Sequence, residues 1–101
     1  MWLMVLFDLP VGTKTERRHA TRFRTFLKND GYLMIQFSVY ARVCRAEEGV
    51  EKHLKRVQSN LPPAGSVRTL QITDKQFARM KLLVGHREKS EKKATQQLVL
   101  L

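Results

Sequence analysis

The amino-terminal segment constrains the fold more than any other part of the chain. Residues 2–7 (WLMVLF) are all apolar, and Asp8 and Pro10 come soon after them. A strand with one solvent-exposed face alternates apolar and polar residues, whereas a short unbroken apolar run is typical of a strand buried on both faces. The segment therefore predicts a central strand of a sheet, with Asp8 at the point where the strand emerges.

An amphipathic helix is expected next, over residues 13–30. Ala20, Phe23 and Leu27 recur at helical spacing, whereas most of the basic side chains of this segment lie toward the other side. Gly31 follows the segment and suits the left-handed conformation that often ends a helix.

The middle of the chain predicts two strands, a second helix and a further strand. Residues 32–44 are rich in β-branched and aromatic side chains, are long for one strand, and divide near Phe37–Ser38. A helix with acidic residues in its first turn extends from about residue 46 to Pro62, and residues 66–73 (SVRTLQIT) form a strand. The order βαββαβ is typical of an α+β, ferredoxin-like antiparallel sheet with both helices on one face.

The carboxyl-terminal part extends this domain, which we place at residues 1–85. Residues 74–80 predict a short helical turn, and residues 81–85 (KLLVG) a short apolar strand. A charged tether over residues 86–95 then leads to the apolar end QQLVLL. A free apolar strand invites edge pairing, so we expect this end to dock on its own sheet edge, a partner protomer or another protein.

The charge balance indicates a polyanionic partner. The chain has 101 residues, and 19 Lys and Arg against nine Asp and Glu give a net charge of +10. Such an excess is most often found in proteins that bind nucleic acid and less often in those that bind an anionic membrane surface. Cys44 is the single cysteine, which suits a reducing cytoplasm, and no segment has the features of a signal peptide or a membrane span.

Several familiar sites are disfavoured by spacing. GTKT at residues 12–15 lacks the glycine spacing of a phosphate-binding loop. His19, His53 and His86 are scattered, and with one cysteine they do not give the spacing of a zinc site. We expect His53 to be a surface residue of the second helix. Nothing in the spacing favours a nucleophilic Ser or Cys site.

Asp8 has two interpretations from the residues alone. An aspartate at a strand end commonly caps the following turn. Alternatively, a carboxylate held rigidly at the end of a central strand could bind Mg²⁺, which takes oxygen ligands and often keeps several waters. A two-fold dimer would bring two copies of Asp8 together, and a metal held by both could activate water for attack on a phosphodiester.

The basic face of the first helix is the candidate nucleic-acid contact. Glu16 is the only acidic residue in 12–28, so a purely solvated face is the weaker interpretation. Aromatic residues do not interleave with the basic ones along this segment, so the pattern favours contact with the phosphate backbone without base readout. The residues that we single out are Lys14, Arg17, Arg18 and Arg22.

A family resemblance covers residues 2–85. LFDLP at the end of the first strand, RFRTFL in the first helix and GYLMIQFSVYAR over the next two strands resemble the small CRISPR-associated adaptation protein, the second member of the Cas set and often described as an endoribonuclease. TDKQFARM followed by LLVG is similar to the version found in type II systems. The combination of FD-x-P and QFSVY at this spacing carries the resemblance.

The resemblance implies a fold, partners and a site. The fold would be ferredoxin-like, in a homodimer whose carboxyl-terminal strands cross to the other protomer's sheet. Asp8 would be the Mg²⁺ ligand at the dimer interface, Ser38 a supporting residue near it, and Arg22 a basic position of the first helix. Lys14, Arg17 and Arg18 match only a generally basic region, and Met34 stands where some members carry a basic residue. The partners would be the CRISPR integrase subunit and double-stranded DNA, or RNA.

Three functions are therefore weighed. The first is a homodimeric scaffold that holds duplex DNA without sequence readout while the integrase inserts spacers. The second is a Mg²⁺-dependent endonuclease, either an endoribonuclease or a DNase, that uses paired Asp8. The third is a generic RNA-binding domain of the same element order, which would need an aromatic stacking motif on its third strand. That strand reads SVYARVCR, so the third function is the weakest.

Overall fold

Four strands and three helices make up the computed structural model, which describes residues 1–85. The predicted tether (86–95) and the apolar end (96–101) lie outside the described residues. In chain order the elements are β1 (Trp2–Asp8), α1 (Lys14–Asn29), β2 (Leu33–Gln36), β3 (Val39–Val43), α2 (Glu47–Gln58), β4 (Ser66–Ile72) and α3 (Asp74–Ala78). The predicted βαββαβ order and the division of 32–44 near Phe37–Ser38 are confirmed.

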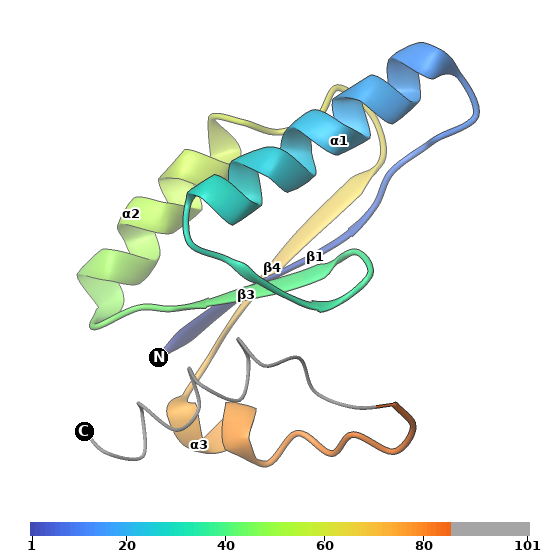
Figure 1. Ribbon diagram of the computed structural model, residues 1–101. Coiled ribbons are helices and arrows are strands. Elements are labelled where there is room, and N and C mark those ends of the chain that lie inside the picture. The colour runs from blue at the N-terminus through green and yellow to red at the C-terminus, as the bar shows by residue number, and fades with distance from the viewer. Residues whose placement is uncertain (86–101) are drawn as a thin grey trace.

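The strands form one antiparallel sheet in the order β2-β3-β1-β4. β1 pairs with β3 on one side and with β4 on the other, so its prediction as a central strand is confirmed. Helices α1 and α2 lie together over one face of the sheet, and the short α3 lies against the opposite face (Figure 1). This arrangement is the ferredoxin-like α+β fold that the element order predicts.

Side chains of β1 alternate between two cores, which explains its unbroken apolar sequence. Leu3, Val5 and Phe7 pack under α1 and α2, in a cluster that also contains Phe23, Leu27, Val50 and Val57. Trp2 and Met4 face the other way, in a second cluster with Ala41 and Phe77. The rings of Trp2 and Phe77 stack at 3.8 Å between centroids, which fixes α3 on that face.

Two sequence-based predictions are wrong. The predicted strand at 81–85 is irregular chain, with Leu83 and Val84 87% and 89% exposed, because no strand of the described residues pairs with it. His53 was expected at the surface, but only 8% of it is exposed. Helix α2 turns this imidazole toward the end of α1, where it bonds to Asp30 at 2.9 Å.

Candidate nucleic-acid interface

Helix α1 begins with a capping box that involves the one acidic side chain of the helix. Thr13 Oγ1 accepts a hydrogen bond from the backbone N–H of Glu16, and Glu16 Oε1 accepts one from the N–H of Thr13. These bonds satisfy donors that every helix start leaves free. They also hold the Glu16 carboxylate at the helix start, and within residues 1–85 it forms no ion pair with the basic side chains of α1.

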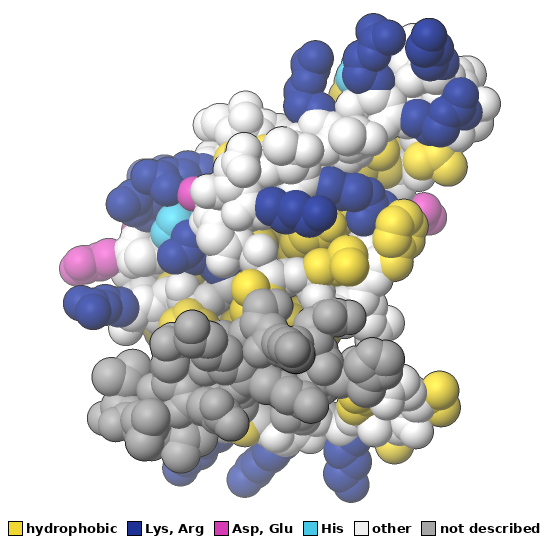
Figure 2. All heavy atoms as spheres, viewed as in Figure 1, with side chains coloured by type: hydrophobic (Ala, Val, Ile, Leu, Met, Phe, Trp, Pro, Cys, Tyr) yellow, Lys and Arg dark blue, Asp and Glu magenta, His cyan; other side chains and the backbone are white. Residues whose placement is uncertain are grey.

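The predicted basic residues of α1 share one surface. They line a shallow, open hollow of about 450 Å³, and none of them forms an ion pair within residues 1–85. Figure 2 shows dark-blue side chains gathered over the end of the molecule where α1 begins. The residues that line the hollow are Lys14, Arg17, Arg18, Thr21 and Arg22. The structure brings the four predicted residues together, and their role stays a prediction.

Arg17 has a structural contact as well. Its guanidinium donates to the backbone oxygen of Val11 at 3.1 Å and lies 3.5 Å from that of Gly12. These bonds brace the loop between β1 and α1. Arg17 therefore has fewer free donors for a phosphate than its neighbours Arg18 and Arg22.

Asp8 lies away from this basic surface. The alternation along β1 directs its side chain to the same face as Trp2 and Met4, opposite to α1 and α2. The residue is exposed, and its carboxylate has no hydrogen bond or ion pair with any residue in the described part of the chain. Asp8 therefore does not cap the following turn, as the simpler interpretation expected, and its oxygens are available to a ligand.

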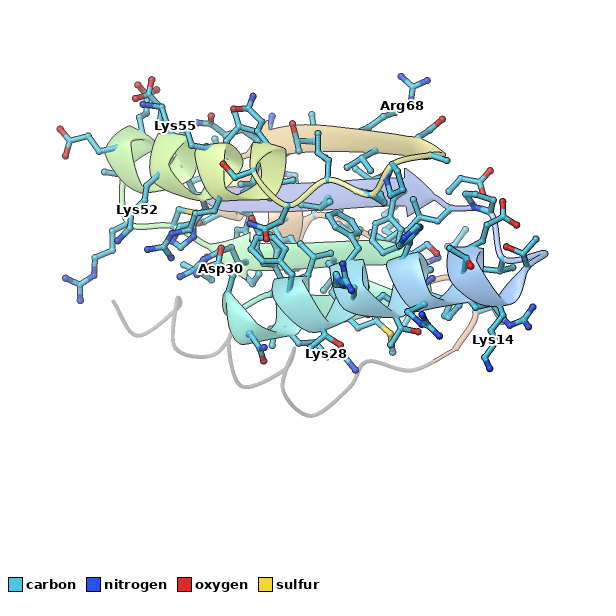
Figure 3. All side chains as sticks on the ribbon, turned by 90° about the horizontal axis from the view of Figure 1, so that it is seen from above. Lys14, Lys28, Asp30, Lys52, Lys55 and Arg68 are labelled. Atoms are coloured by element: carbon cyan, nitrogen blue, oxygen red, sulfur yellow. The ribbon has the colours of Figure 1, made fainter. Side chains whose placement is uncertain are left out.

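A second basic residue lies near Asp8. A shallow hollow of about 200 Å³ is lined by Leu6, Phe7, Asp8, Ser66 and Arg68. Asp8 is paired across the strands with Ser66 and Leu6 with Arg68, so Arg68 is a diagonal neighbour of Asp8. Figure 3 shows Arg68 and Lys14 at opposite margins of the molecule. The sequence did not single out Arg68, because the pairing of β4 with β1 is not visible in it.

Ser38 lies beside the end of β1 but does not face the Asp8 carboxylate. It has a φ of 71°, and its carbonyl accepts a hydrogen bond from the N–H of Phe7 at 3.0 Å. Its hydroxyl accepts a bond from Arg24 of α1 at 2.9 Å, on the side of the sheet that the helices cover. Ser38 therefore supports the strand end through the backbone of Phe7.

The residues described suit a metal only in part. No group of three or more His, Cys, Asp or Glu side chains within residues 1–85 could hold an ion. Asp8 offers one free, exposed carboxylate per chain. Mg²⁺ is commonly bound by one or two carboxylates and keeps several waters, so a single carboxylate with a second copy from a sister molecule fits that ion.

A cluster at the far end of α1 has a structural role. Asp30 accepts bonds from His53 at 2.9 Å and from Arg56 at 2.7 Å, and it lies at the opposite end of α1 from Lys14 (Figure 3). Burial alone would raise the pKa of Asp30, but the bonds from His53 and Arg56 and their charges hold it below its usual value. The cluster joins α1 to α2 and lies away from both hollows.

Cys44 does not have the environment of a nucleophile. The thiol is buried, and burial raises the pKa of Cys44 above its ordinary value. A reactive cysteine needs a lowered pKa and access to substrate. Among the described residues, no helix is long and apolar enough to span a membrane.

Comparison with known proteins identifies relatives along the whole chain. The family model described as CRISPR associated protein Cas2 matches residues 1–80. The CRISPR-associated endoribonuclease Cas2 of Acidovorax ebreus (strain TPSY) is 52% identical over 101 residues, which cover 100% of this chain and 99% of that protein. The protein of the same name from Flavobacterium psychrophilum is 45% identical over 100 residues, covering 99% of this chain and 87% of the relative.

A solved structure shows the same fold. The crystal structure of Streptococcus pyogenes Cas2 at pH 6.5 aligns with a TM-score of 0.60 and 20% identity, covering 83% of this chain and 100% of that one. At this identity the likeness bears on the fold, and it agrees with the ferredoxin-like sheet described above.

Proposed function

The chain belongs to the CRISPR associated protein Cas2 family, and we propose that it is a subunit of CRISPR adaptation, the acquisition of new spacers. It acts in the cytoplasm as a homodimeric scaffold that binds duplex DNA in complex with the CRISPR integrase. RNA is the other nucleic acid that the same surface could bind.

The observation that carries the proposal is the basic surface of α1. Lys14, Arg17, Arg18 and Arg22 line one open hollow, and Glu16 is occupied in the helix cap. Long cationic side chains on the outside of a helix match phosphates, which supply most of the affinity of non-specific DNA binding. The set has no Asn or Gln to read adenine and no carboxylate to read cytosine, so we assign its cations to phosphates. We therefore expect binding that is indifferent to sequence and sensitive to salt.

The exposed apolar segment after α3 supports the homodimer. Leu83 and Val84 are almost fully exposed, and β4 pairs only with β1 within the described residues. An open strand edge beside an exposed apolar segment is a template for pairing with another chain. Exchange of this segment between two copies would cover both features and leave further surfaces for the integrase.

A Mg²⁺-dependent endonuclease is the second candidate. The relatives are named endoribonucleases. The free carboxylate of Asp8, which lines one hollow together with Arg68, favours the endonuclease function. Asp8 from each protomer would hold the ion, and bound Mg²⁺ would supply a Lewis acid that makes water a better nucleophile. The backbone bond between Phe7 and Ser38 would hold the strand end in place.

The substitution Asp8→Asn separates the two functions. The scaffold function predicts that duplex binding, and spacer insertion with the integrase, persist in the variant. The endonuclease function predicts Mg²⁺-dependent cleavage by the purified wild-type chain that the variant lacks. Glu51→Gln, which removes an exposed carboxylate of α2, is the matched control and should change neither property. Loss of duplex binding in Asp8→Asn alone would contradict the scaffold.

A further inference from the structure

One exposed aromatic ring lies against a basic side chain of α1, although the sequence places it on a different element. Phe37, in the two-residue turn between β2 and β3, is 78% exposed. Its ring lies 3.9 Å from the guanidinium carbon of Arg24 on α1. The contact could not be expected from the α1 sequence, where aromatic and basic residues do not interleave on one face.

Arg24 belongs to a basic stripe along one flank of α1. Lys14, Arg17, Arg24 and Lys28 are separated by three, seven and four residues, which places them on one side of a helix. Figure 3 shows the labelled ends of this stripe, Lys14 and Lys28, on the same side of α1. At 1.5 Å per residue the stripe is about 21 Å long.

The guanidinium of Arg24 is largely withdrawn from solvent, whereas Lys14, Arg17 and Lys28 are exposed residues. One of its nitrogens donates to Ser38 Oγ at 2.9 Å, and another is buried without a partner among the described residues. Its carbon also lies 5.0 Å from the centroid of the Phe7 ring. Arg24 is therefore poorly placed to bind a phosphate, and its contacts hold the turn that carries Phe37.

The turn itself is fixed at the cost of backbone strain. Ser38 has a φ of 71°, which is uncommon for a residue with a side chain. Its carbonyl bonds to Phe7 and its hydroxyl to Arg24, so both groups of Ser38 are fastened to neighbouring elements. Such strain persists where the surroundings determine the conformation, and here the fastened turn holds Phe37 beside Arg24.

We propose that Phe37 is a stacking platform for an unpaired nucleobase of a strand whose phosphates contact the exposed cations of this stripe, Lys14, Arg17 and Lys28. One face of the ring rests on Arg24, and the exposed face is free to take a base. An aromatic ring beside a basic groove is the arrangement by which proteins bind single-stranded nucleic acid, because every base has a π-face. The proposal rests on the proposed nucleic-acid function and adds a base contact to it.

A nucleobase fits this ring better than a protein surface does. A stable protein interface buries about 1,200 Å² or more, whereas one aromatic side chain contributes on the order of 200 Å². A base needs only the single ring, which its contact with the Arg24 guanidinium holds in place. The alternative is that a second copy of the chain covers Phe37, and the test must distinguish this alternative from base stacking.

The test compares normal and abasic single strands of equal length, in deoxy and ribo forms, binding to the full-length chain. The wild type should prefer the strands that carry bases. Phe37→Ala should weaken binding to them by roughly five- to 150-fold and leave abasic strands and blunt duplex unaffected. Phe37→Leu, which keeps an apolar side chain, should behave like Phe37→Ala, and Phe37→Trp should retain the preference. The salt dependence should stay the same in all variants.

Controls make each outcome decisive. Leu61→Ala removes an apolar side chain that is 50% exposed outside the stripe and should have no effect. The stacking assignment would be overturned if Phe37→Ala lost affinity equally for normal and abasic strands, or lost none for either. A change in the oligomeric mass of Phe37→Ala would overturn it as well. Failure of the wild type to bind any of the nucleic acids would instead overturn the proposed function itself.

Discussion

Gly65 lies close to the end of β1, in a backbone conformation that favours glycine. It has a φ of +95°, and a Cβ atom at this position would lie 2.6 Å from the Asp8 carbonyl oxygen. Any larger residue must therefore adopt a strained backbone and also displace the end of β1. Position 65 shows how one backbone contact fixes the strand end that carries the candidate site.

We predict that Gly65→Ala lowers the free energy of unfolding by roughly 2–4 kcal/mol, the sum of a left-handed backbone and a steric overlap. Chemical denaturation measures the change. Gly49→Ala in α2 is the matched control, because its Cβ would lie 3.6 Å from that of Cys44, an ordinary contact, and alanine favours a helix. If Gly65→Ala had the same denaturation midpoint as the wild type, this result would contradict the packing described here.

Asp30 joins the two helices and should make the fold sensitive to acid. Its side chain is 10% exposed and pairs with His53 and Arg56. We predict that Asp30→Ala costs about 2–4 kcal/mol, because it leaves the buried donor His53 and the exposed donor Arg56 without their acceptor. Arg56→Ala, which removes only the more exposed partner, should cost less in the same denaturation experiment.

The sign of the pH effect follows from the pKa of Asp30. Because it is lower in the folded state than its ordinary value of 3.8, the carboxylate contributes stability above that pH. The contribution is lost as the pH falls from about 4 through the lowered folded value. Unfolding free energies measured from pH 6 to pH 2 should converge for wild type and Asp30→Ala at the acid end. If the two curves of unfolding free energy against pH stayed parallel, the stabilising role of the Asp30 carboxylate would be contradicted.

At the scale of elements, the position of α3 depends mainly on the packing of Phe77 against Trp2. Phe77 is buried, and its ring lies parallel to that of Trp2, with 6° between their planes. A helix of five residues is not stable alone, so its position comes from this contact and from the ion pair between the Met1 amino group and Asp74.

We predict that Phe77→Ala costs about 3–5 kcal/mol and exposes Trp2 to water. Trp2 is the one tryptophan of the sequence, so a red shift of fluorescence reports its environment directly. Phe37→Ala serves as the reference, since that aromatic ring is already exposed and its loss should leave the emission unchanged. An unshifted spectrum in Phe77→Ala would mean that α3 does not cover Trp2.

Much of the architecture could be predicted because its signals are local. The apolar run of β1 and the periodicity of α1 each lie within one segment, and the element order then selects the ferredoxin-like sheet. The clustering of Lys14, Arg18 and Arg22 likewise follows from helical spacing within α1.

The missed features all depend on contacts between segments. His53 was expected at the surface because its partner Asp30 lies 23 residues away in the sequence. Arg24 and Phe37 meet only because α1 packs above the β2–β3 turn, and Arg68 reaches the Asp8 hollow only through strand pairing. The segment 81–85 has the composition of a strand, but a strand needs a neighbour, and composition does not say which chain supplies it.

At the scale of the whole molecule, the account requires two copies of the chain. We predict that sedimentation equilibrium gives twice the chain mass of 11.8 kDa. The double substitution Leu83→Asp and Val84→Asp should shift the population toward monomer, because two charges cannot be buried in an apolar pairing. Lys75→Asp, on the exposed side of nearby α3, controls for charge alone. A wild-type monomer at all concentrations would contradict the dimer.

The most direct test of the central claim, that α1 binds the phosphate backbone, is the salt dependence of duplex binding. Each lost phosphate contact lowers the slope of log K against log salt by about 0.9. Replacing Arg17, Arg18 and Arg22 by alanine should therefore flatten the slope by about 2–3, with the smaller value if Arg17 mainly braces its loop. Replacing Arg45, Lys52 and Lys55, which are exposed near or on α2, removes the same charge and should alter the slope far less. Equal slopes for the wild type and the α1 variant would contradict the account.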